Sequence, residues 1–109
     1  MNTMTLSALA EPNRLRIVEL LRDKPRSVGE IAGKLRMRQP QASKHLRVLS
    51  EAGWVEVRPH AQQRIYRLQA KQFEEFDKWV QTFKHLWEER FEALDEILEE
   101  LKEEQRRDR

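Results

Sequence analysis

The stretch from Gln39 to Gly53, QPQASKHLRVLSEAG, constrains the fold most strongly because both of its ends are marked. Pro40 stands where the first turn of a helix tolerates its fixed φ, and Gly53 stands where a helix would end. Three apolar residues recur at helical spacing between them: Ala42, Leu46 and Leu49. The sequence therefore predicts one bounded amphipathic helix over about Gln39–Ala52.

The remaining faces of this helix carry polar side chains that are neutral or positive: Gln39, Gln41, Ser43, Lys44, His45 and Arg47. Side chains of this kind contact base edges and phosphates in nucleic acids. An ordinary surface helix has a similar pattern, so the neighbouring segments must distinguish the two interpretations.

The segments before this helix predict three more helices. An apolar stretch at about residues 4–10 is too short to be stable alone, and a longer helix follows from Pro12 to Asp23. Ser27 and Glu30 have the S-x-x-E spacing of a capping box, which predicts a short helix ending near Leu35. Only three residues then precede the Gln39 helix, as in a helix-turn-helix. The alternative is a helical hairpin in a small bundle.

The next segment favours a β-hairpin over a plain bundle. Trp54–Arg58 and Arg64–Leu68 are rich in β-branched and aromatic residues, and residues 59–63 separate them as a loop. Taken alone, this charged hairpin is a solvated sheet edge. Directly after a helix-turn-helix, the segment Trp54–Leu68 is better interpreted as a wing whose Arg58 and Arg64 contact the phosphate backbone.

A single long helix is predicted from Lys71 to about Glu104, where there is no Pro or Gly. Its apolar face exceeds what a small body covers, which favours a homodimer with this helix and the first short helix at the interface. Residues 105–109 are expected to be frayed. The expected interface residues are Leu6, Leu9, Phe73, Phe76, Val80, Phe83, Trp87 and Leu94.

Composition and charge limit the class of protein. A chain of 109 residues is long enough for one domain, which we place at residues 1–104, and it has no cysteine for disulfides or thiolate metal sites. No apolar run reaches the length of a membrane span, so we expect a cytoplasmic protein with no membrane partner. Residues 1–69 hold 13 Lys and Arg against 6 Asp and Glu, whereas residues 70–109 hold 8 against 13. A polyanion would therefore meet the first part of the chain.

Four motifs in order resemble the ArsR-type winged helix-turn-helix transcriptional regulators: LAEPNRLRI from Leu9, QPQASKHL from Gln39, LSEAG from Leu49 and the strand Arg64–Leu68. The resemblance covers nearly the whole chain. It implies a mainly α fold with a small β-hairpin, in the order of four helices, two strands and a last helix. It also implies a homodimeric bacterial or archaeal repressor that binds double-stranded DNA, with Gln39, Gln41, Ser43 and Lys44 toward bases and His45 and Arg47 in support.

The sequence departs from the metal-sensing branches of that family. Ser27 and Gly29 stand where the arsenic and cadmium sensors have cysteines. The only candidates for a zinc site on the last helix are Glu74, His85 and Glu88. The alternative is that His85 and Glu88 form an ordinary solvated pair on a charged helix. We therefore expect no metal and no cofactor. The aromatic spacing from Trp79 to Arg90 is similar to a non-metal branch, although dimer core explains these rings as well as a ligand pocket does.

Two other function classes remain for comparison. The winged helix could serve as a protein-interaction module, which would not need the basic character of residues 1–69. An enzyme has little support, because the chain shows no Gly-rich phosphate loop and no Ser, His and acid set at recognisable spacing. The operator, the effector, and the choice between repressor and activator are not encoded in these patterns.

Overall fold

Side chains near helix ends account for most of the helix boundaries in the first part of the chain. A computed structural model describes residues 1–108. Helix α1 spans Thr3–Leu9, and the side chain of Asn2 accepts a hydrogen bond from its first turn. Helix α2 spans Pro12–Leu20, where the Glu11 carboxylate accepts from the Arg14 amide at 2.9 Å. Helix α3 spans Val28–Leu35 and begins with the predicted capping box, since Ser27 and Glu30 bond to each other's backbone amides.

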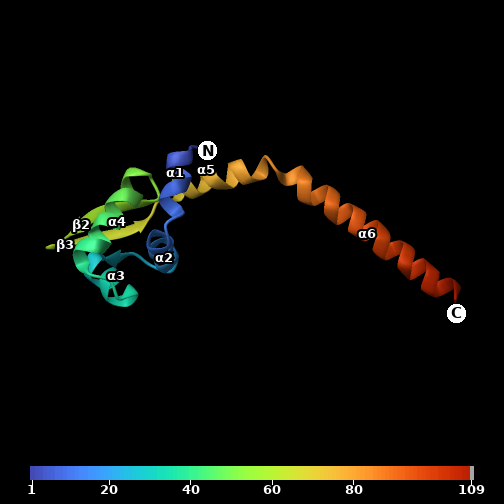
Figure 1. Ribbon diagram of the computed structural model, residues 1–109, viewed down its shortest axis with the longest axis horizontal. Helices are drawn as coiled ribbons and strands as arrows, with labels where there is room; N and C mark the ends of the chain where they lie inside the picture. Colours follow the sequence, from blue (N-terminus) through green and yellow to red (C-terminus); the bar gives the residue numbers. More distant parts are fainter. Residues whose placement is uncertain (109) are drawn as a thin grey trace. The chain divides into compact units, whose positions relative to one another are not determined.

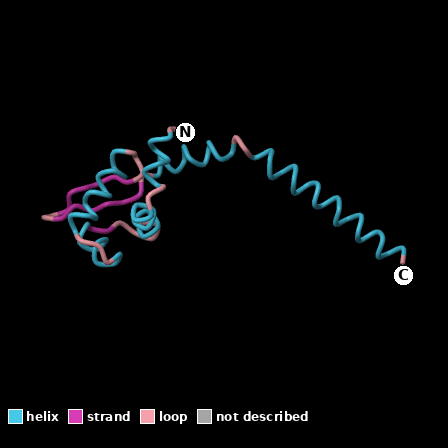
Figure 2. The backbone as a smooth tube through the Cα atoms, in the orientation of Figure 1, coloured by secondary structure: helices cyan, strands magenta, loops and turns pink. Residues whose placement is uncertain are grey.

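Helix α4 spans Gln39–Glu51 and is followed by a three-stranded antiparallel sheet. The strands are β1 (Arg26–Ser27), β2 (Val55–His60) and β3 (Gln63–Leu68), in the order β1-β3-β2. Figure 2 shows the β2–β3 ribbon. Strand β2 begins one residue later than predicted and ends two residues later, and β3 begins one residue earlier than predicted. The turn shrinks to two residues because Ala61 adopts a left-handed φ of 56°, so the expected five-residue loop is wrong.

Strand β1, which lies between α2 and α3, is not predicted from the sequence. Arg26 and Ser27 pair with Tyr66 and Ile65 of β3, so the wing is tied to the helix-turn-helix at its base. Arg26 is only 5% exposed, and its guanidinium donates to Asp23 at 3.1 Å. Two residues of strand carry no periodic pattern, so only the pairing with β3 reveals them.

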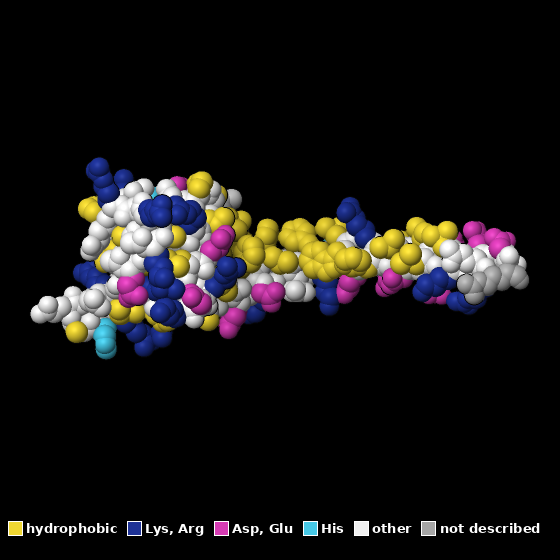
Figure 3. Space-filling model, turned by 90° about the horizontal axis from the view of Figure 1, so that it is seen from below, with side chains coloured by type: hydrophobic (Ala, Val, Ile, Leu, Met, Phe, Trp, Pro, Cys, Tyr) yellow, Lys and Arg dark blue, Asp and Glu magenta, His cyan; other side chains and the backbone are white. Residues whose placement is uncertain are grey.

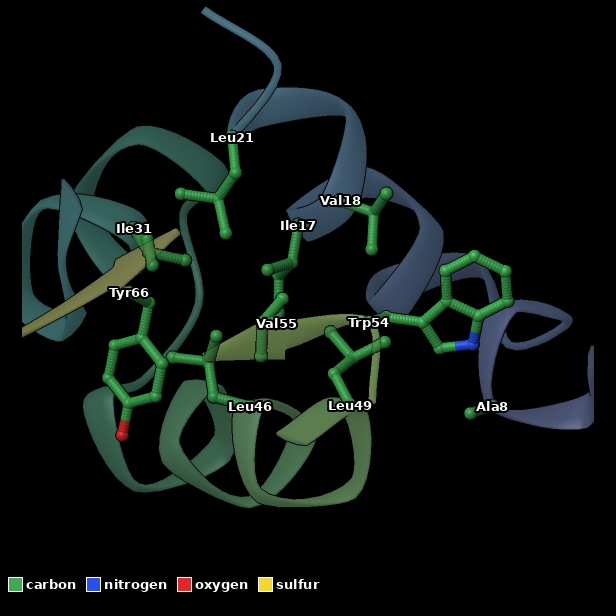
Figure 4. Close-up of a cluster of buried hydrophobic side chains, with 10 residues drawn as sticks. All are labelled: Ala8, Ile17, Val18, Leu21, Ile31, Leu46, Leu49, Trp54, Val55 and Tyr66. Atoms are coloured by element: carbon green, nitrogen blue, oxygen red, sulfur yellow. The ribbon is translucent and has the colours of Figure 1, made fainter. Parts of the chain in front are cut away.

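Trp54 follows α4 directly and lies in the core between Leu49 and Ala8 (Figure 4). It is fully buried, and its indole N–H donates to the Thr5 carbonyl of α1 at 2.7 Å. Phe73 and Phe76 meet its ring edge-on, with centroids 5.1 and 6.0 Å away. These contacts join α1, the sheet and the start of α5 (Ala70–Gln81). The core otherwise comprises Ala8, Ile17, Val18, Leu21, Ile31, Leu46, Leu49, Val55 and Tyr66.

The predicted single helix over residues 71–104 is wrong. Helix α5 ends at Gln81, and a separate helix α6 spans Lys84–Arg107 (Figure 1). The break occurs because the Thr82 hydroxyl donates to the Trp79 carbonyl at 2.6 Å, and the amides of Thr82 and Phe83 bond to residues three positions back. The expected fraying from Gln105 is also wrong as far as Arg107, since this end consists of strong helix formers. Arg109 lies outside the described residues.

The chain divides into two compact units, and we describe each by itself. The first, Met1–Phe76, contains the buried core and is called the body. The second begins at Asp77 and is called the arm, and none of its residues up to 108 is buried. None of the helices within residues 1–108 is both long and apolar enough to cross a membrane.

Candidate nucleic-acid interface

The turn between α3 and α4 is tight because Arg36 adopts a left-handed conformation with φ 54°. The Met37 amide then bonds back to the Ala32 carbonyl at 3.0 Å and closes the end of α3. Arg38 caps α4 without a side-chain hydrogen bond, whereas Pro40 in the first turn needs no amide partner. Arg36 and Arg38 therefore complete the turn, and they add positive charge beside α4.

One face of α4 is held in the core and the opposite face is open. Ala42, Leu46 and Leu49 are fully buried, which fixes the rotation of the helix about its axis. Lys44 and Arg47 lie opposite them and are exposed. Gln41 and Ser43 are exposed on the flanks of this open face, and Gln39 is exposed as the first residue of the helix. The structure thus brings five of the six polar α4 residues singled out from the sequence onto accessible surface.

His45 is the exception among these residues. Its side chain is only 16% exposed, and its Nδ1 lies 3.7 Å from the Glu11 carboxylate at the start of α2. Hydrogen bonds from the backbone of Arg14 and Asn13 lower the pKa of Glu11 against the raising effect of burial. His45 therefore connects α4 to α2 and is less accessible than the other polar α4 residues, while its role as a DNA contact stays a prediction.

The register of the wing separates its two predicted arginines. Arg64 pairs with Pro59 and lies on the same face of β3 as Tyr66, whereas Arg58 pairs with Ile65 and faces the other way. The carboxylate of Glu56 lies 3.9 Å from Arg58 and forms a close ion pair with Arg67. The two wing arginines therefore have different surroundings, although the sequence predicts a phosphate contact for both.

Arg64 and α4 share one hollow on the surface of the body. This hollow has a volume of about 360 Å³ and lies between one flank of α4 and the wing. Arg47 at its rim is paired with Glu51 at 3.2 Å, and both side chains are well exposed. A pair this open is worth less than about 1 kcal/mol, so Arg47 can exchange Glu51 for a phosphate. The lining residues are Val28, Ser43, Leu46, Arg47, Ser50, Glu51, Val57, Arg64 and Tyr66.

The sequence also predicted residues for a dimer interface and candidates for a metal site. Leu9, Phe73 and Phe76, assigned to a dimer interface, pack against the body's own core, so their burial needs no second chain. Of the metal candidates, Glu88 pairs with Lys84 at 3.2 Å. Within residues 1–108 no group of three His, Asp or Glu side chains is arranged to hold a metal ion.

Comparisons with known proteins agree with a helix-turn-helix formed by these elements. A family model described as a helix-turn-helix domain matches residues 9–58. The biofilm growth-associated repressor of Agrobacterium fabrum is 48% identical over 63 residues, which are 58% of this chain and 54% of that protein. The chain thus spans about half the length of the curated relatives it matches.

Solved structures extend the match over most of the chain. The crystal structure of a possible transcriptional regulator for arsenical resistance is 34% identical, with a TM-score of 0.66, and covers 72% of this chain and 82% of that one. The homodimeric winged helix-turn-helix DNA-binding domain of a possible ArsR-family regulator from Mycobacterium bovis is 30% identical. That match covers 75% of this chain and 76% of the other, with a TM-score of 0.64. Both the fold and the resemblance seen in the sequence are confirmed: this chain belongs to the ArsR family of winged helix-turn-helix transcriptional regulators.

Proposed function

We propose that this protein is a homodimeric, sequence-specific double-stranded DNA-binding repressor. The observation that carries the proposal is the open face of α4, which presents Gln41, Lys44 and Arg47 while the opposite face is locked into the core. A helix fixed in this way can enter a major groove with its side chains already oriented. The excess of positive charge in residues 1–69 supports binding to a polyanion.

The proposed roles follow from where each side chain lies. Gln39 and Gln41 suit bidentate contacts with adenine, while Ser43 and Lys44 contact bases or the adjacent backbone. Arg47 and Arg64, on either side of the shared hollow, hold one phosphate strand between the helix and the wing. Arg58 lies on the other face of the wing beside Glu56 and contributes less.

Homodimerisation and repression rest on the relatives. The Mycobacterium bovis domain is described as homodimeric, and the Agrobacterium protein is named a repressor. A two-fold symmetric dimer places two α4 helices against two half-sites about one helical turn or a multiple of it apart. The proposed operator is therefore an inverted repeat.

The test begins by selecting bound duplexes from a random pool and then compares variants on the selected site and on random DNA. Gln41→Ala should weaken binding to the selected site by about 1 to 3 kcal/mol and leave random DNA unchanged. Arg64→Ala should weaken binding to the selected site and to random DNA. It should also lower the slope of log affinity against log salt concentration by about one. Arg58→Ala is the matched control and should have a smaller effect than Arg64→Ala on both duplexes.

Two outcomes would contradict the proposal. Equal losses on selected and random DNA for Gln41→Ala and Arg64→Ala would remove the division between base reading and backbone contact. Undetectable binding to any duplex at low salt would favour the second candidate, a protein-interaction module, because a body with this charge should attract DNA at least non-specifically.

A further inference from the structure

A second hollow lies on the body, between α1 and the C-terminal half of α4. It has a volume of about 380 Å³, which falls in the range of about 300 to 1,000 Å³ typical of small-molecule sites. Glu51 lines both this hollow and the one beside the wing. We call it the α1–α4 hollow, and the lining residues that matter here are Met4, Ala8, Arg14, Val48, Glu51 and Ala52.

Arg14 supplies the positive charge of the α1–α4 hollow, and the end of α1 holds its guanidinium in place. Its Nε donates to the Ala8 carbonyl at 2.6 Å, and its Nη2 donates to the Ser7 carbonyl at 3.4 Å. A guanidinium has five N–H groups in a planar fork that matches a carboxylate. Within residues 1–108 the other N–H groups of Arg14 form no hydrogen bond, so they are left for a ligand.

Glu51 supplies the negative charge of the same hollow. Its side chain is 68% exposed, and its carboxylate accepts from the Nε of Arg47 at 3.2 Å. Because this pair is open to water, a cation of a ligand can replace Arg47 beside Glu51 at little cost. The α1–α4 hollow thus presents one positive and one negative side chain to the same ligand.

Apolar side chains from two helices form another part of the lining. Met4 of α1 is 77% exposed, and Val48 and Ala52 at the end of α4 are partly buried. An apolar group in the hollow would remove this surface from water, which favours binding.

We propose that the α1–α4 hollow binds a small zwitterion with an apolar tail, of the class of the apolar amino acids. Its carboxylate pairs with Arg14, its ammonium pairs with Glu51, and its tail covers Met4, Val48 and Ala52. Figure 3 shows Lys and Arg side chains at several places on the visible face of the body, so a carboxylate alone would meet positive charge elsewhere too. Opposite charges in one hollow instead select a molecule that carries both.

The hollow lies away from the α1 residue that is expected at a dimer interface. Met4 and Ala8 lie one helical turn apart on one side of α1, whereas Leu6 lies on the opposite side. A second copy that packs on Leu6 therefore approaches α1 from the other side.

Glu51 connects the ligand to the DNA-binding surface, and this part of the inference rests on the proposed function of Arg47. An ammonium bound to Glu51 weakens its hold on Arg47, which frees the Arg47 guanidinium for a phosphate. Ligand and DNA therefore strengthen each other's binding. The ligand acts as a corepressor.

The first experiment measures binding to the full chain without DNA, by isothermal titration calorimetry. The probes are L-leucine and two analogues that each lack one charge: isocaproate, without the amine, and isoamylamine, without the carboxylate. Leucine should bind at millimolar concentration or below, and each analogue should bind about tenfold more weakly. Absence of saturable leucine binding would overturn the site, and equally tight binding of either analogue would overturn the zwitterion.

Variants assign the two charged ends of the ligand. Glu51→Gln should weaken leucine binding about tenfold and leave isocaproate binding unchanged, because only the ammonium loses its partner. Glu19→Gln, at an exposed acid of α2 outside this hollow, is the matched control and should change neither. An equal effect of the two variants on leucine binding would overturn the role of Glu51.

Arg14→Lys keeps the charge of Arg14 but loses its fork, so it should weaken the binding of both leucine and isocaproate. The melting temperature of this variant shows whether the body still folds. Unchanged binding of both probes would overturn the role of Arg14, and if the variant does not fold, Glu51→Gln decides the site.

The coupling is tested separately on the selected duplex. Leucine should raise the DNA affinity of the unsubstituted protein by up to about fivefold and have no effect on Glu51→Gln. Leucine binding with unchanged DNA affinity would overturn the coupling. If no duplex binds, the proposed function fails, whereas the titration without DNA still decides the site, so the two failures are distinguishable.

Discussion

The body and the arm use apolar side chains in opposite ways. In the body, residues such as Trp54, Ile17 and Leu46 are fully buried, and the chain's own elements cover them. In the arm, Phe91, Leu94 and Leu101 are at least half exposed. Apolar surface stabilises a fold only when it leaves contact with water. The body therefore carries the free energy of folding, while the arm holds apolar surface available for association.

The largest expected effect tests this difference directly. Trp54→Ala should lower the free energy of unfolding by about 3 to 5 kcal/mol, because a cavity replaces an indole that contacts α1, Phe73 and Phe76. Leu98→Ala, at a position of the arm that is 46% exposed, is the comparison variant and should change the free energy of unfolding by less than about 0.5 kcal/mol in dilute solution. Urea unfolding followed by circular dichroism measures both. Similar losses for the two variants would mean that the arm is part of the folded core.

A second prediction concerns the junction where α4 enters the sheet. Gly53 has φ +87°, and a Cβ there would lie 2.9 Å from the Gln72 side chain. Gly53→Ala should cost about 1 to 2 kcal/mol, mostly from the left-handed conformation, since Gln72 is flexible. The control is Gly33→Ala in α3, where nothing lies within 4 Å of the added carbon, and it should stabilise by up to about 1 kcal/mol. Thermal unfolding of both variants measures these changes. An unchanged melting temperature for Gly53→Ala would show that the backbone between α4 and β2 can relax.

The smallest expected effect is the pH dependence of the capping box. The hydrogen bond from the Ser27 amide, followed by that to the Ser27 side chain, holds the pKa of Glu30 below its ordinary value of 4.5. A carboxylate with a lowered pKa stabilises the fold above its ordinary pKa, and the contribution is lost as the pH falls through the lowered value. Glu30→Gln should therefore destabilise the body at neutral pH and converge with the unsubstituted protein in acid. Unfolding curves at several pH values test this prediction. A difference in the free energy of unfolding between the two proteins that stays constant with pH would exclude ionisation of Glu30 as the cause.

Local patterns in the sequence determined much of the body and of the site. The capping box of Ser27 and Glu30, the limits of α4 and its buried stripe depend on neighbours within a few residues, so spacing alone predicted them. The same spacing placed Gln41, Lys44 and Arg47 on the open face. The hairpin followed from residue type, although its turn proved shorter because Ala61 adopts a conformation that residue type does not predict.

Only the tertiary structure decided the contacts between distant parts of the chain. The pairing of Arg26 with Tyr66, the packing of Phe73 on Trp54 and the turning of His45 toward Glu11 join residues far apart in sequence. The spacing of residues along the chain does not predict which helices and strands contact each other, because these contacts depend on how whole elements pack. The break after Gln81 was likewise not predicted, because the helix-forming composition continues through Thr82 while the backbone amides there bond to residues three positions back.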